Sequence, residues 1–134
     1  MTFLLDVNAL LALGLLSHEF HQRVANWLLT LAAQEHIVIA TCAITELGFV
    51  RILSQVPAYG YTLQDARSLL LRVKAKSIVP VKFLADDQDL ARIPNWVKFP
   101  KQLTDGHLAQ LAAANDVVFA TSDRGIPGAF LIPR

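Results

Sequence analysis

The stretch Phe3-Leu4-Leu5-Asp6-Val7-Asn8 places an acidic residue directly after a short apolar run. Such a run predicts a buried strand over Thr2 to Val7, and Asn8 stands where a helix is expected to begin. An acid directly after the first predicted strand is a pattern that recurs along the chain, and its recurrence predicts the fold.

Three further acids occupy similar junctions between an apolar segment and a helix or turn. Glu46 opens a helical segment just after the apolar stretch Ile37–Ala40, Asp105 opens another helical segment, and Asp123 lies just past Val117–Ala120. Sites in open α/β sheets form outside the carboxyl ends of the parallel strands. We therefore expect these four carboxylates to gather along one edge of a parallel sheet.

Strand-like and helical patterns alternate along the whole chain, which predicts an α/β fold with a parallel central sheet. Strands are expected at Thr2–Val7, Ile37–Thr41, Ser77–Val81 and Val117–Thr121, with a last apolar piece at Ala129–Ile132. Helices are expected at Ala9–Leu16, Thr45–Leu53, Asp86–Ile93 and Leu103–Ala114. Two more helices are expected to begin after the N-cap residues Ser17 and Thr62. The length predicts one domain over residues 1–134.

Composition excludes some classes of protein. The chain is 54% hydrophobic and has 12 Lys and Arg against 11 Asp and Glu, which is not the basic balance of a general nucleic-acid coat protein. Its longest clean apolar stretch, Ala9–Leu16, is well short of the ~20 residues of a transmembrane helix, so no membrane association is expected. The single Cys42 cannot form an internal disulfide, which fits the cytoplasm.

Four carboxylates in one pocket repel one another and must take up protons or find cations. Magnesium and manganese favour oxygen ligands, and such an ion can activate water for attack on a phosphodiester. Asn8 is placed to orient a carboxylate, and Thr41, Thr121 and Ser122 offer hydroxyls near the same edge. Each acid alone also has an ordinary structural interpretation, as a helix cap, a turn former or a first-turn residue.

Four blocks of this sequence, in this order, resemble the PIN-domain family, and most closely its VapC-type toxins. They are Leu5–Leu13, Thr45–Arg51, Thr104–Ala109 and Thr121–Gly125. The resemblance implies a Rossmann-like three-layer sandwich and an endoribonuclease that uses Mg²⁺ or Mn²⁺ to cleave RNA. It also implies a homodimer silenced by a small VapB-type antitoxin.

By the same resemblance Asp6, Glu46, Asp105 and Asp123 form the catalytic and metal-binding set. Asn8, Thr121 or Ser122 and Arg51 are implied as supporting residues. Two rival functions stay open at this point: a PIN-like module that binds RNA or protein without turnover, and a phosphatase with Asp6 as nucleophile. The phosphatase is disfavoured because such enzymes commonly place a second acid where this chain has Asn8.

Two other groups of residues invite a functional interpretation. His107 follows Asp105 by two positions and could reach a substrate phosphate. Asp86, Asp87 and Asp89 form a dense acidic cluster, but they lack the glycine and the glutamate of an EF-hand loop. We interpret this cluster as a solvated, capped helix start.

Overall fold

The computed structural model describes residues 1–134 and contains one five-stranded sheet in the order β3-β2-β1-β4-β5, with every pair parallel. The strands are β1 (Thr2–Leu5), β2 (Val38–Cys42), β3 (Val81–Leu84), β4 (Val118–Thr121) and β5 (Phe130–Leu131). The helices are α1 (Val7–Gly14), α2 (His21–Ala32), α3 (Ala43–Gln55), α4 (Leu63–Lys76) and α5 (Leu103–Ala114). The predicted α/β class and parallel sheet are confirmed.

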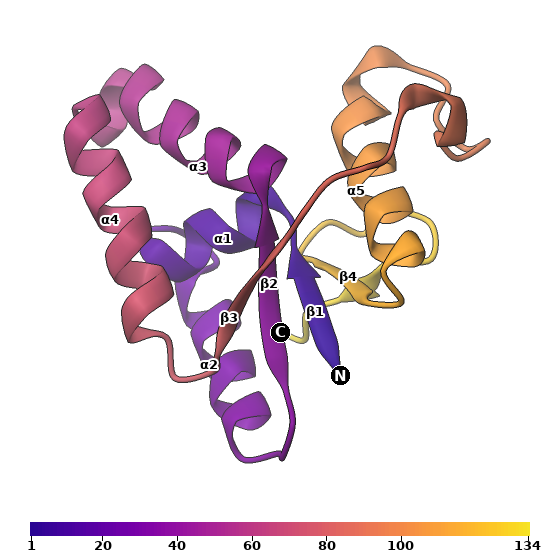
Figure 1. Cartoon of the computed structure of the whole chain (residues 1–134). Coiled ribbons are helices and arrows are strands. Elements are labelled where there is room, and N and C mark those ends of the chain that lie inside the picture. The colour runs from indigo at the N-terminus through magenta and orange to yellow at the C-terminus, as the bar shows by residue number, and fades with distance from the viewer.

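Alternate residues of the strands enter two separate cores, because successive side chains of a strand point to opposite faces of the sheet. On β1, Phe3 and Leu5 belong to the larger core beneath α1 to α4, whereas Leu4 belongs to the smaller core beneath α5. Helices therefore cover both faces, which gives the predicted three-layer sandwich (Figure 1).

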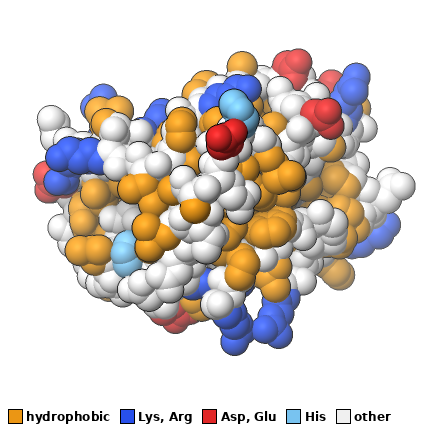
Figure 2. Space-filling view, turned by 90° about the horizontal axis from the view of Figure 1, so that it is seen from below, with side chains coloured by type: hydrophobic (Ala, Val, Ile, Leu, Met, Phe, Trp, Pro, Cys, Tyr) orange, Lys and Arg blue, Asp and Glu red, His pale blue; other side chains and the backbone are white.

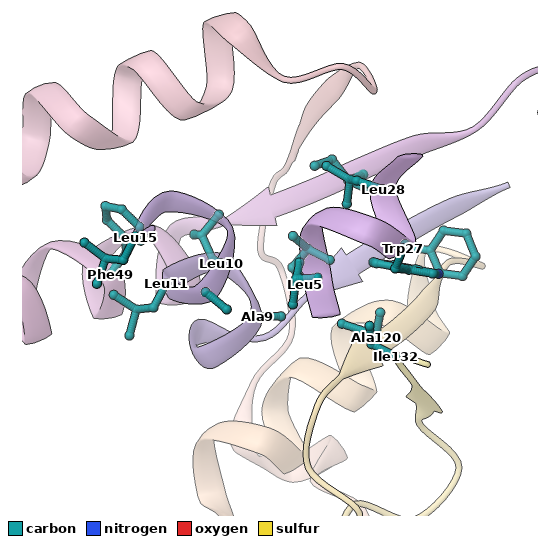
Figure 3. Packing of buried hydrophobic residues seen from close by; sticks show 14 of the residues in the cluster. Leu5, Ala9, Leu10, Leu11, Leu15, Trp27, Leu28, Phe49, Ala120 and Ile132 are labelled. Atoms are coloured by element: carbon teal, nitrogen blue, oxygen red, sulfur yellow. The ribbon is translucent and has the colours of Figure 1, made fainter. Parts of the chain in front are cut away.

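The larger core is built around α1, whose buried side chains lie between β1 and the other helices (Figure 3). Trp27 of α2 packs edge-on against Phe3 with ring centroids 5.1 Å apart, and Phe130 of β5 stacks on Trp27 at 5.7 Å. The last strand is thus anchored to the first through three aromatic rings.

The strand order places a topological switch point between β1 and β4. From β1 the chain builds outward through β2 to β3, and it then returns to add β4 and β5 on the other side of β1. Strands β1 and β2 run upward in Figure 1 and the other strands are parallel to them, so the carboxyl ends of the strands lie between the α3–α4 pair and α5. Ligand sites in open α/β sheets form at such points.

The opposite end of the molecule carries the amino ends of the strands. Figure 2 shows this end, where hydrophobic side chains gather near the middle and Lys and Arg side chains lie scattered around them. No helix of the structure is both long enough and apolar enough to cross a membrane.

Three predicted elements are wrong or displaced. The third strand runs over Val81–Leu84 and shares only Val81 with the predicted Ser77–Val81. Val79 is buried in the larger core without joining the ladder, which explains why an apolar pattern there suggested a strand.

The predicted helix over Asp86–Ile93 is reduced to one 3₁₀ turn, Leu90–Arg92, capped by Asp89. The carboxylate of Asp86 instead accepts from the backbone N–H of Gln88, and local bonds of this kind compete with a helix. Similarly, α2 begins at His21 rather than after Ser17, because the His18 ring accepts from the Phe20 N–H.

Candidate active site

Asp6 directly follows β1 and serves as the N-cap of α1. Its Oδ1 accepts from the Ala9 N–H at 2.7 Å, and its Oδ2 accepts from the Thr121 hydroxyl. Only 4% of the residue is exposed. The capping interpretation is therefore correct, and the second carboxylate oxygen bonds Thr121 of β4.

Burial is the main cause that raises the pKa of Asp6. The hydrogen bonds from Thr121 and Ala9 act in the opposite direction, and the charge of Asp123 raises the pKa further. With both oxygens engaged and little surface exposed, Asp6 is poorly placed for nucleophilic attack. This geometry counts against the aspartyl phosphatase.

Asp105 lies in the first turn of α5 and faces the other two aspartates. Its pKa is raised to about 6, first by burial and then by the charges of Asp6 and Asp123. The three aspartates, from β1, α5 and the segment after β4, thus form one electrostatically coupled cluster, called here the aspartate cluster.

The position of Asp105 depends on its neighbour Gly106. A Cβ atom added to Gly106 would lie 2.3 Å from Cγ2 of Val97 and 3.6 Å from Cδ of Pro94. The segment before α5 therefore packs against the helix at the point where the helix carries its acid, and glycine is required for that close approach.

Asp123 is exposed and its backbone is fixed by a tight turn after β4. Its Oδ1 accepts from the Gly125 N–H at 2.8 Å, and its own N–H donates to Oγ1 of Thr121 at 2.9 Å. Thr121 thus hydrogen-bonds both the Asp6 carboxylate and the Asp123 backbone, and it fixes the positions of these two residues relative to each other.

Glu46 stands apart from this cluster. It lies in the first turn of α3, and its Oε2 accepts from the Thr41 hydroxyl and from Nζ of Lys74 at 2.6 Å. Its charge is not among the causes that shift the pKa of Asp6 or Asp105. The sequence predicted four acids in one place, and the structure brings together three aspartates and a separate Glu46–Lys74 pair.

The predicted supporting residues divide into two groups. Thr41 and Thr121 are buried and bond site carboxylates, as their positions at strand ends suggested. Ser122 is half-buried, whereas Asn8 and Arg51 are exposed, and none of these three has a side-chain hydrogen bond to a site carboxylate.

Lys74 is the residue of the site whose role sequence reasoning missed. It lies 28 positions from Glu46, and only the packing of α4 on α3 brings them together. No short-range sequence pattern predicts an ion pair between two residues this far apart in the chain.

His107 and the acidic cluster before α5 turn out to be partners. The His107 ring bonds the Asp86 carboxylate, which links α5 to the segment that follows β3. This contact supports the structural interpretation of His107 over the phosphate-binding one.

The donor set fits a hard divalent cation by its charge and chemistry. In the side-chain positions of this structure, no three His, Cys, Asp or Glu side chains converge closely enough to hold an ion. The charge of Asp123 nevertheless raises the pKa of Asp6, and the charges of Asp6 and Asp123 raise the pKa of Asp105. A cation between these carboxylates would relieve this repulsion.

Comparison with known proteins gives relatives that align over most of the chain, although no protein-family model matches it. Ribonuclease VapC38 of Mycobacterium tuberculosis is 39% identical over 127 residues, which cover 92% of this chain and 86% of the relative. Ribonuclease VapC44 of the same species is 36% identical over 132 residues, covering 94% of this chain and 89% of the relative.

A solved structure supports the same fold. The crystal structure of VapC20 of M. tuberculosis, described as a toxin that cleaves the sarcin–ricin loop, matches with a TM-score of 0.56. The match covers 90% of this chain and 87% of that one at 12% identity, so it supports the fold alone. On the strength of the sequence relatives, this chain belongs to the VapC family of ribonucleases.

Proposed function

We propose that this protein is a metal-dependent endoribonuclease and the toxin of a toxin–antitoxin pair. The observation that carries the proposal is the aspartate cluster at the switch point of the sheet, in a chain of the VapC family. Relatives named as ribonucleases support RNA as the substrate.

Asp6, Asp105 and Asp123 would hold a Mg²⁺ or Mn²⁺ ion, and Glu46 would become a fourth ligand only when released from Lys74. When bound, such an ion polarises the scissile phosphodiester and makes water a stronger nucleophile. Thr121 holds Asp6 and Asp123 in a fixed relation, which lowers the cost of ordering them when the substrate binds.

In the metal-free site the pKa of Asp105 is raised to about 6 by burial and by the charges of Asp6 and Asp123, and a bound cation would favour its ionised form. Because Asp105 lies at the amino end of α5, it is also the acid most easily moved by changes in the segment packed against Gly106.

RNA that is single-stranded or in loops is the expected substrate class, since its backbone can be splayed into a groove. A VapB-type antitoxin and a homodimer are further parts of the proposal, as is a cytoplasmic location. An apolar groove of about 510 Å³ between α3 and α4 supports a protein partner. Its lining includes Leu47, Leu63 and Leu71, which are 58%, 61% and 63% exposed.

The test is to incubate partner-free protein with a mixed cellular RNA pool in the presence of magnesium, manganese or EDTA. New RNA ends are then mapped by sequencing, with Asp6→Asn as the matched variant. Asn keeps the helix cap, so the fold is expected to persist while cleavage falls by at least ~100-fold.

RNA ends that appear equally in EDTA would remove the metal from the proposal, and undiminished cleavage by Asp6→Asn would remove Asp6 from the catalytic set. RNA binding by folded protein without any cleavage would favour the binding module instead.

A further inference from the structure

The Glu46–Lys74 ion pair is the only contact in the structure between a site carboxylate and a basic side chain. Nζ of Lys74 lies 2.6 Å from Oε2 of Glu46, and the two side chains are 27% and 22% exposed. A pair this sheltered is screened less by salt and water than an ordinary surface pair.

Further contacts hold both partners in place. The Thr41 hydroxyl donates to the same Oε2 of Glu46, so this oxygen already has two donors. Lys74 stands in the last turn of α4, where the helix dipole favours a cation, and its Nζ lies 5.7 Å from the centre of the Phe83 ring. The ammonium group is therefore favoured in this position by more than its pairing with Glu46.

The pair has an electrostatic consequence for the aspartate cluster. Glu46 is held at the carboxyl edge of the sheet, because Thr41 of β2 donates to it and β2 pairs with β1, the strand that Asp6 follows. A carboxylate that is neutralised by a neighbouring ammonium group adds little negative potential to the site.

We propose that Lys74 is a built-in counter-ion of Glu46, which keeps this carboxylate out of the metal-binding set and thereby lowers the affinity of the site for a divalent cation. The inference rests on the proposed function, in which the aspartate cluster binds metal. Lys74 is a positioning residue in this account, since it acts through Glu46.

Removing the ammonium group is expected to strengthen metal binding. In Lys74→Met the carboxylate of Glu46 is uncompensated and free to approach the ion, which predicts Mn²⁺ binding about five- to tenfold tighter than in the wild type. Lys74→Arg keeps the charge and should bind Mn²⁺ as the wild type does. In the double variant Lys74→Met/Glu46→Gln the gain should disappear, leaving the affinity of Glu46→Gln alone.

The measurement is isothermal titration calorimetry of partner-free protein with Mn²⁺ near neutral pH, without RNA. Circular dichroism and thermal unfolding in EDTA establish that each variant is folded. Lys76→Met is the matched control, because Lys76 belongs to the same last turn and carries the same charge but does not bond Glu46.

Unchanged or weaker Mn²⁺ binding by folded Lys74→Met would overturn the inference, as would an equal gain in Lys76→Met or in the double variant. Failure of the wild type itself to bind Mn²⁺ would overturn the proposed metal dependence as well. If the wild type binds Mn²⁺ and Lys74→Met binds it equally well, the proposed metal dependence is retained and only the role of Lys74 as counter-ion is refuted.

Discussion

The side chain of Asp6 both caps a helix and contributes a carboxylate to the candidate site. Its Oδ1 begins α1 through the Ala9 N–H, and its Oδ2 meets Thr121 across the switch point. The sequence predicted its position after a strand and its proximity to other acids. It could not show that Thr121 would link it to Asp123, because that bond spans 115 positions along the chain.

Asp105 gives a testable pH dependence of stability. Its pKa is about 6 in the folded protein, whereas an aspartate side chain ordinarily has a pKa of 3.8, so the folded state binds more protons between these values. Stability is therefore lost as the pH rises through this window, and the loss is complete above about pH 7. Asp105→Asn removes the charge that causes the loss.

We expect Asp105→Asn in EDTA to be more stable than the wild type at about pH 8, by on the order of 1 kcal/mol after allowance for partial exposure of the carboxyl group. At about pH 4 the difference should shrink towards zero. Urea unfolding at both pH values measures it, with the exposed Asp87→Asn as control. A gain that is equal at both pH values would contradict a charge-based cause.

At the scale of elements, the contact between α5 and the segment before it is set by Gly106. Alanine there is favoured by helix propensity by ~1 kcal/mol, yet its Cβ would lie 2.3 Å from Cγ2 of Val97. Val97 is β-branched and stiff, so the segment itself must move. Overpacking of this kind costs roughly 1–3 kcal/mol.

Gly106→Ala is therefore expected to lower the melting temperature and to reduce RNA cleavage by displacing Asp105. Val97→Ala removes the obstructing methyl group, so the double variant Gly106→Ala/Val97→Ala should be more stable than Val97→Ala alone. A double-mutant cycle of thermal unfolding measures this coupling. If the effects of the two substitutions on the free energy of unfolding were additive, the contact between position 106 and Val97 would not be the cause of the destabilisation.

Elements also show where prediction from sequence succeeds. The strands β1, β2 and β4 are buried and their apolar runs located them to within one or two residues. The position of edge strand β3 was predicted wrongly because Lys82 and Phe83 are exposed. The strand therefore lacks the continuous apolar run that marks a buried strand. A strand paired on one side only leaves a weak sequence signal.

At the scale of the whole molecule, the candidate site joins residues from three distant parts of the chain, so a metal ion bound there should stabilise the entire fold. A ligand that binds only the folded state stabilises it by about 2.7 kcal/mol at 100 times its dissociation constant. Mn²⁺ should therefore raise the melting temperature of the wild type in a concentration-dependent way. The rise should be much smaller for Asp105→Asn or Asp6→Asn than for Asp87→Asn.

Equal thermal shifts for all variants would mean that Mn²⁺ binds elsewhere. The sequence predicted the three aspartates of this cluster, since each stands just after a strand or in the first turn of a helix. It did not predict that Glu46 would be paired with Lys74, because long-range side-chain partners depend on how α3 and α4 pack.

The two outer strands of the sheet have a consequence for assembly. Strand β5 is only two residues long, and β3 carries Lys82 on the other border. A very short border strand and a lysine on a border strand both hinder another chain from continuing the hydrogen-bonded ladder. A second copy or a partner is therefore expected to dock through the helices, and the blocked sheet borders guard the protein against fibrous aggregation.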